Sequence, residues 1–326
     1  YRTVFSRHFL LVTADNAGNV VVATTGGGLT VSHGVDVDRE GNLLLHSVLG
    51  GIDLDSTIRS DAGHISVIAG GNLEQDVEGD IITSGPGTID VESVSGSITM
   101  IDGSTTTTAG ENIRYAAGQN VVVSSIDAGA GDVNIRAISG NITDKEDEAP
   151  ELDAGEPDVM ADELRMMAGG KIGEPGVINH NLLETSVNEL SALAAGPSGI
   201  FVSNSRALMV GGIDSVDANR VQGDGTTIIE GDANPLSGVR TVDNAGNIAL
   251  ITKHGDLTVA SRTKADGNGN ILLQSVSGTA DLRSKVRSER GSISVIGYVD
   301  VVQRSEERSV GKEWVSKRRS RWSPYH

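Results

Sequence analysis

The chain has 326 residues, of which 42 are glycine, none is cysteine and 3% are aromatic. Its 44 Asp and Glu residues outnumber its 26 Lys and Arg residues and give a formal net charge of −18. This acidity argues against nucleic acid as a partner, because phosphate binding requires a basic face. The absence of cysteine excludes disulfide bonds and thiolate metal sites. No stretch is apolar over the length that a membrane span requires.

Residues 13–68 recur without a gap at 241–296, with about half of the paired positions identical. Most other pairs exchange similar side chains, such as Val20 with Ile248 and Leu43 with Ile271. Self-similarity at a fixed spacing is typical of repeat architectures. We therefore interpret the two copies as stretches of one rod, duplicated as a block, rather than as two domains.

Within each copy, a glycine-containing turn precedes two apolar residues separated by one position. Gly18 precedes Val20 in this way, and Gly41 precedes Leu43. Alternation of this kind indicates half-buried strands, and glycine or asparagine at the turns is expected to adopt positive φ. The turns recur about every 22 residues, which is the length of one solenoid coil. The pattern predicts an all-β chain folded as a parallel β-helix (β-solenoid) of about 13 coils. A β-sandwich would also give short alternating strands, but not a nearly constant coil length.

The sequence divides into four segments. Solenoid coils are predicted over 1–142 and, continuing the same rod, over 159–303. Between them, 143–158 contain eight acidic residues, one lysine and two prolines. We interpret this segment as an extruded, solvated loop, with a calcium-binding loop as the alternative. Stretches 162–167 and 182–194 also fit short helices, but the surrounding turn-then-strand pattern favours strands.

The composition changes at Arg304. Residues 304–326 contain seven Lys or Arg and three Asp or Glu, together with both tryptophans, Trp314 and Trp322. This segment resembles the conceptual translation of a common short-read sequencing adapter. We therefore leave it out of the fold and expect 304–326 to be disordered and to pack on nothing.

Residues 36–41 look like the start of an EF-hand loop. The twelfth position is Ser47, so the bidentate ligand is missing, and the copy at 264–269 begins with Lys264. Turns in which Asp and Asn bond their own backbone are the simpler interpretation. We assign no metal, cofactor-binding or catalytic residue and expect that the chain is not an enzyme.

Some aspartates lie between inward aliphatic residues and are expected to face outward. A line of outward carboxylates is where β-helical polysaccharide lyases and hydrolases keep their catalytic acids, so a carbohydrate-active enzyme is the alternative function. No Lys or Arg recurs beside these residues in the expected register, and few aromatic residues are available to stack on sugar rings. The aspartates are Asp53, Asp55, Asp90 and Asp281. Five histidines are interpreted as surface residues: His33, His46, His64, His180 and His254.

The runs A-G-N-[VI]-x-[VL], residues 255–259 (GDLTV) and the segment 183–212 resemble repeats of filamentous-haemagglutinin-like and autotransporter-like giant bacterial surface proteins. The resemblance covers most of 13–303. It implies a right-handed parallel β-helix, secretion across the outer membrane to a secreted or cell-surface location, and adhesion to glycan or protein ligands of host cells, surfaces or matrix. We therefore expect a fragment of a large bacterial adhesin or adhesive stalk, with a purely structural spacer as a further alternative. Open ends of such a rod would offer strand edges for self-association.

Overall fold

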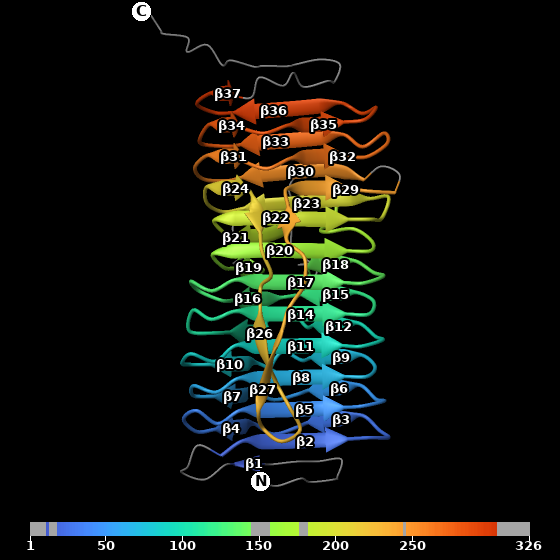
Figure 1. Cartoon of the computed structure of the whole chain (residues 1–326), viewed down its shortest axis with the longest axis vertical. Helices are drawn as coiled ribbons and strands as arrows, with labels where there is room; N and C mark the ends of the chain where they lie inside the picture. The colour runs from blue at the N-terminus through green and yellow to red at the C-terminus, as the bar shows by residue number, and fades with distance from the viewer. Residues whose placement is uncertain (1–10, 13–17, 145–156, 176–181, 244–245, 305–326) are drawn as a thin grey trace, which may run out of the picture.

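The structure, a computed structural model, describes residues 11–12, 18–144, 157–175, 182–243 and 246–304. These residues form strands and turns without a helix, so none of them forms a helix that could span a membrane. The chain winds as a parallel β-solenoid of about 11 turns with a spacing of roughly 23 residues (Figure 1). The predicted all-β solenoid is confirmed. The expected number of coils is too high, because residues 212–237 leave the solenoid.

In the first part of the rod, each coil contributes one long strand and two short ones. The long strands lie in a 15-stranded sheet, and the short strands lie in a six-stranded and a 12-stranded sheet. The long strands are β2 (Val20–Thr24), β5 (Leu43–Ser47), β8 (Ile65–Ala69), β11 (Ile89–Ser93), β14 (Ile113–Ala117), β17 (Val133–Ala137), β20 (Glu163–Ala168) and β22 (Glu189–Ala194).

From β2 to β17, two short strands follow each long strand. The six-stranded sheet contains β3 (Leu29–Val31), β6 (Ile52–Leu54), β9 (Leu73–Gln75), β12 (Ile98–Met100), β15 (Val121–Val123) and β18 (Ile142–Asp144). The 12-stranded sheet begins with β1 (Leu11–Val12), β4 (Val35–Val37), β7 (Ile58–Ser60), β10 (Ile81–Thr83), β13 (Thr105–Thr107), β16 (Ser125–Asp127), β19 (Val159–Met160) and β21 (Leu183–Ser186).

The core is one continuous aliphatic cluster that extends from Val20 to Val295. A single coil has too few apolar residues to bury a core, so stability comes from stacking coil on coil. One aromatic residue is fully buried in this cluster, Tyr115. Its hydroxyl lies 2.7 Å from Thr106 Oγ1 and 3.2 Å from Gln75 Oε1, which satisfies the polar group that burial would otherwise leave unpaired.

The glycines of the repeated turns are required by close approach between coils. A Cβ on Gly63 would lie 2.0 Å from the carbonyl oxygen of Gly41, and one on Gly87 would lie 2.0 Å from that of Gly63. Neither Gly41 nor Gly63 has a φ in the left-handed region. The expectation of positive φ is therefore wrong for these two glycines, and the stacking distance explains them instead.

The polar residue after each turn glycine forms a ladder along the rod. Asn19 Oδ1 accepts the amide of Asn42 at 2.9 Å, and Asn42 Oδ1 accepts the amide of His64 at 2.9 Å. His64, interpreted above as a surface residue, continues this ladder, because its Nδ1 accepts the amide of Thr88 at 3.0 Å. Burial lowers the pKa of His64, which favours the neutral ring that this acceptor role requires.

The long strands change from the 15-stranded sheet to the 12-stranded sheet at two six-residue strands, β22 and β23 (Gly199–Asn204). The first half of β22 pairs with β24 (Leu208–Val210) and its second half with β29 (Val239–Thr241). On the other side, β23 pairs along its whole length with β30 (Asn247–Thr252). From here on, the long strands belong to the 12-stranded sheet and pairs of short strands belong to the 15-stranded sheet. The further long strands are β33 (Ile271–Ser275) and β36 (Ile293–Gly297), and the further short strands are β31 (Leu257–Val259), β34 (Ala280–Leu282), β37 (Val301–Gln303), β32 (Thr263–Ala265) and β35 (Val286–Ser288).

The long strands of the second copy therefore lie on the side of the rod opposite to those of the first copy. Strands β2 and β30 occupy equivalent positions in the sequence, yet β2 lies in the 15-stranded sheet and β30 in the 12-stranded sheet. Both copies belong to one stack of coils, as predicted. The change of side was not predicted from the sequence. Stretches 162–167 and 182–194 lie in β20, β21 and β22, so the helical interpretation is wrong.

Two predicted boundaries differ from the structure. Thr143 and Asp144 still belong to β18 and pair with β15, whereas 145–156 of the acidic segment lie outside the described residues. At the other boundary, the amide of Arg304 donates to the carbonyl of Leu282 at 2.9 Å. The prediction that 304–326 pack on nothing is therefore wrong at its first residue, and 305–326 lie outside the described residues.

Candidate functional site

Residues 212–237 form a strap that lies along the outer face of the 15-stranded sheet (Figure 1). The strap leaves the solenoid between β24 and β29. Its base is the antiparallel pair β25 (Gly212–Ile213) and β28 (Leu236–Ser237), and its arm is the hairpin β26 (Ala218–Val221) and β27 (Thr227–Glu230). The arm runs back towards the N-terminal end of the rod. The sequence pattern predicts coils throughout 159–303 and does not predict this strap, so that prediction is wrong for 212–237.

The tip of the strap docks on the turn asparagines of the first coils. Gly225, whose φ of +82° requires glycine, presents its carbonyl oxygen to two side-chain amides. Asn19 Nδ2 donates to this oxygen at 3.0 Å and Asn42 Nδ2 at 3.1 Å. The same two asparagines therefore hold neighbouring coils through Oδ1 and the strap through Nδ2.

Beside the tip, an apolar patch on the outer face of the coils receives Val221. This side chain is buried with Val21 and Leu44, and Ile68 packs against the group. The amide of Val221 donates to Ser66 Oγ at 2.8 Å. Burying one valine in this way contributes about 1.5 kcal/mol.

An ion-pair cluster holds the middle of the strap. Arg220 Nε donates to Asp90 Oδ2 at 2.6 Å, and Arg220 Nη2 donates to Glu92. Arg114, the register partner of Asp90 on the next coil, donates to Asp90 Oδ1 at 2.6 Å and to Glu92 Oε2 at 3.2 Å. Glu230 of the strap lies 3.8 Å from each arginine. Burial opposes ionisation of Glu92, but the two arginines outweigh it and lower the pKa of that carboxyl.

Asp232 provides a second anchor near the base of the strap. Its carboxylate accepts hydrogen bonds from Asn134 Nδ2 at 3.1 Å, from Arg136 Nη1 at 2.9 Å, and from Arg165. Arg165 Nη2 also donates to the carbonyl of Asn234 at 3.1 Å. Outward side chains from β2 to β20 thus form one surface that matches the strap in shape, polarity and charge.

Two of the aspartates considered as catalytic acids are engaged in ion pairs. Asp90 is fully buried under the strap, and Asp281 is 5% exposed. Asp281 accepts Arg283 Nε at 2.8 Å and Arg304 Nε at 3.1 Å. The expectation that no Lys or Arg lies beside these aspartates in register is therefore wrong for Asp90, whose register partner is Arg114. The register partners of Asp281 are Thr258 and Val302, so its arginines lie outside the register. Asp53 and Asp55 are exposed.

Three carboxylates lie together where the acidic segment joins the rod. Ligand atoms of Asp144, Asp158 and Glu184 lie within 4.8 Å of one another, and the amide of Glu184 donates to Asp158 Oδ2 at 2.9 Å. Among the described residues, 36–41 and 264–269 contribute no such group. They form coil turns in which Gly41 donates to the carbonyl of Asp38 and Gly269 to that of Asp266. Calcium binding by 143–158 stays a prediction.

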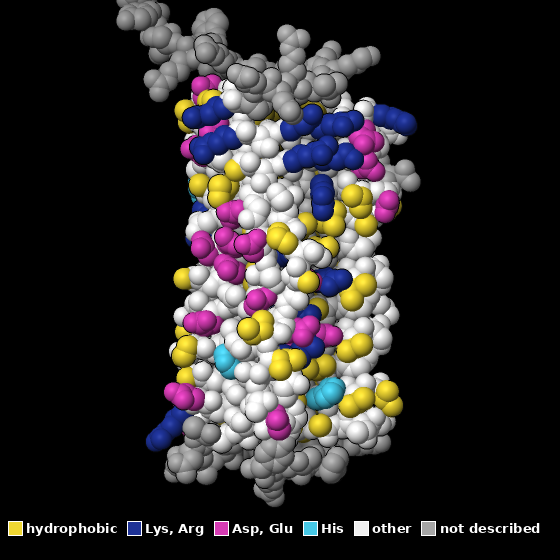
Figure 2. Space-filling view, in the orientation of Figure 1, with side chains coloured by type: hydrophobic (Ala, Val, Ile, Leu, Met, Phe, Trp, Pro, Cys, Tyr) yellow, Lys and Arg dark blue, Asp and Glu magenta, His cyan; other side chains and the backbone are white. Residues whose placement is uncertain are grey.

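Beyond the strap, the 15-stranded sheet carries a column of cations on its outer face. Arg240 of β29, Lys264 of β32 and Arg287 of β35 are register partners on successive coils. Figure 2 shows Lys and Arg side chains gathered over these strands. Like charges directly opposite one another destabilise a sheet, by about 1 kcal/mol for each adjacent pair in water at strand spacing. This basic column is therefore not explained by the stability of the fold.

The cations of this face differ in how they are neutralised. Lys264 Nζ lies 3.0 Å from Asp266 and 2.9 Å from Glu289. Arg240 and Arg287 form no ion pair or side-chain hydrogen bond with any other residue that the structure describes.

Comparison with protein-family models, with curated proteins and with solved structures gave no match. The class of protein is therefore defined by the fold: the chain is a parallel β-solenoid repeat protein. Its outer face has two distinct parts, one covered by the strap and one carrying the basic column.

Proposed function

We propose that the chain is part of a rod in a large secreted or cell-surface protein and acts as an adhesive stalk. The contrast between inner and outer positions of the two repeat copies supports this proposal. Inward positions keep their residue type, as Val67 and Val295 do, whereas the outward Asp36 corresponds to Lys264.

The strap is a second feature that supports a stalk. It ties coils that are far apart in the sequence, because the contact between Arg220 and Asp90 joins residues 130 positions apart. A stalk that presents ligands at a distance benefits from coils that do not separate. The alternative of a carbohydrate-active enzyme loses support, because Asp90 and Asp281 are paired with arginines and a catalytic carboxyl has to reach its substrate.

The adhesive role is tested with beads coated with the full chain. The beads are passed under flow over layers of erythrocytes and of collagen, next to beads coated with an acidic globular protein of similar net charge. We expect the rod-coated beads to be retained on at least one of these surfaces. Retention equal to that of the control beads on both surfaces would contradict adhesion and leave the spacer as the function.

A further inference from the structure

We propose that the basic column and its neighbours form a binding surface for a linear carboxylated polysaccharide. The surface consists of Arg240, Lys264 and Arg287 together with Arg262 and Lys285, which precede β32 and β35. It lies on the outer face of the rod, beyond the region that the strap covers (Figure 2). The inference rests on the proposed adhesive function and names the ligand class of one surface.

Within the internal duplication, the second copy is more basic than the first. Residues 13–68 contain two Lys or Arg and seven Asp or Glu, a net charge of −5, whereas residues 241–296 contain seven and five, a net charge of +2. Three of the changes fall on this surface, where Gly34, Asp36 and Thr57 of the first copy correspond to Arg262, Lys264 and Lys285. Arg287 corresponds to Arg59, and Arg240 precedes the second copy.

The surface already holds carboxylates of the chain itself. Lys264 bonds to Asp266 and Glu289. Arginine matches a carboxylate with its planar, forked donors. The side chains of Arg240 and Arg287 have no such partner among the described residues, so an external carboxylate has donors available on either side of Lys264.

The geometry favours a polysaccharide over a folded partner. The three cations of the column follow the axis of the rod at the strand spacing of about 4.8 Å, on the outer face of a sheet. A linear polyuronate presents carboxylates at regular intervals along an extended chain, which matches a linear series of cations. The overall charge of −18 opposes approach of an anion elsewhere on the protein.

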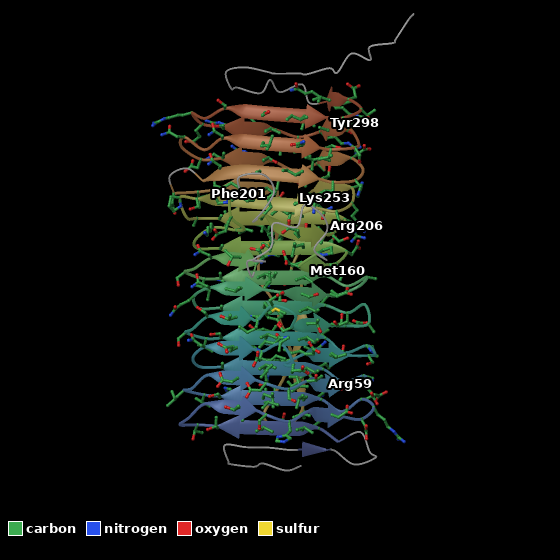
Figure 3. All side chains as sticks on the ribbon, turned by 180° about the vertical axis from the view of Figure 1, so that it is seen from behind. Arg59, Met160, Phe201, Arg206, Lys253 and Tyr298 are labelled. Carbon is green, nitrogen blue, oxygen red and sulfur yellow. The ribbon has the colours of Figure 1, made fainter. Side chains whose placement is uncertain are left out.

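The test measures binding of the full chain to immobilised alginate by biolayer interferometry, in buffer with a chelator so that calcium does not gel the polymer. The test variant carries Arg240→Gln, Arg262→Gln and Arg287→Gln. The matched control carries Arg39→Gln, Arg59→Gln and Lys253→Gln, which remove the same charge from other positions. Figure 3 shows two of these, Arg59 and Lys253, in the view from behind.

We expect the test variant to bind alginate about tenfold more weakly or worse, because each lost arginine removes charge-assisted hydrogen bonds. We also expect its affinity to depend less steeply on salt. The control variant should stay within about twofold of the original chain, since its substitutions only weaken long-range attraction, which salt screens. The melting temperature of the test variant should not fall, because the substitutions remove repulsion within the column.

Three results would overturn the inference: equal losses in both variants, no alginate binding by the original chain, or equally tight binding of DNA, dextran sulfate or polyglutamate. Each would show that the column does not recognise a carboxylated polysaccharide. The proposed adhesive function would still stand if the original chain fails to bind alginate while its beads are retained on erythrocytes or collagen.

Discussion

The two repeat copies, 13–68 and 241–296, share the inward aliphatic residues of the core (the inner ladder) and differ in their outward residues. The long strands of the first copy receive the tip of the strap through Val21 and Leu44. The long strands of the second copy lie on the opposite side of the rod, and its short strands β32 and β35 carry Lys264 and Arg287 of the basic column on the same sheet as the strap. Stacking constrains the inward positions in both copies alike, whereas the outward positions differ between the part that the strap covers and the part that it leaves open.

The largest expected loss of stability comes from placing a charged residue in the inner ladder. Val67→Asp places a carboxyl in the core, where Val67 is fully buried, and should cost about 4 kcal/mol or more. Its counterpart Val295 lies in β36, the last long strand, and is 7% exposed. Val295→Asp should therefore cost about half as much. Urea denaturation of both variants gives the comparison, and equal costs would mean that the position of a coil in the stack does not matter.

The next effect concerns the strap. Arg220→Ala leaves the buried Asp90 with Arg114 alone and should cost about 3 kcal/mol. Hydrogen exchange should then accelerate in 218–230 and stay unchanged in the second copy. The control is Arg59→Ala, which removes an exposed pair with Asp61 and should cost less than about 1 kcal/mol. Unchanged protection of 218–230 in Arg220→Ala would show that the cluster does not hold the strap.

The strap should also respond to pH. The pKa of Glu92 is lowered from its ordinary value of 4.5, so its ion pairs contribute fully above that value and are lost as the pH falls through the lowered pKa. Hydrogen exchange in 218–230, corrected for the intrinsic rate, should accelerate below about pH 4.5. Glu92→Gln should remove part of this dependence. A pH profile identical in the two proteins would assign the effect to other carboxyls.

The smallest expected effect compares one turn in the two copies. Arg39 has a φ of 57°, and its counterpart Gly267 has a φ of 54°. Arginine is disfavoured in this left-handed region, whereas glycine adopts it readily. Arg39→Gly should therefore stabilise the chain by up to about 1 kcal/mol, and Gly267→Arg should destabilise it by about the same amount. Thermal melting of both variants tests this, and shifts of the same sign would contradict it.

The inner ladder could be predicted from the sequence because the signal is local. A strand begins within two residues of each turn glycine, as at Val20 after Gly18 and at Leu43 after Gly41 on successive coils. The change of the long strands from one side of the rod to the other could not be predicted, because it depends on the pairing of β22 with two different strands, β24 and β29. The residues of β22 have the same burial pattern as those of β20, which pairs with a single strand on each side.

The strap could not be predicted because its contacts are distant in the sequence and lie outside the ladder. A signal was nevertheless present at the second position of the long strands, which faces outward. A surface exposed to water would not be expected to carry Val21 and Leu44 there, nor an Asp90 that is directly followed by Arg114 in register. A further departure from the aliphatic pattern, Tyr115, marks a polar site within the core.

The strap also determines how the rod would respond to tension. A stack of coils that is pulled from one end separates coil by coil, because each coil touches only its neighbours. Here Gly225 is bonded to Asn19 and Asn42, while Asp232 is bonded to Arg165 of β20, six long strands after β2. Peeling the first coil therefore requires the strap to detach as well. The hairpin links coils from β2 to β20 into one mechanical unit, so this part of the rod should yield at a higher force than the coils beyond it.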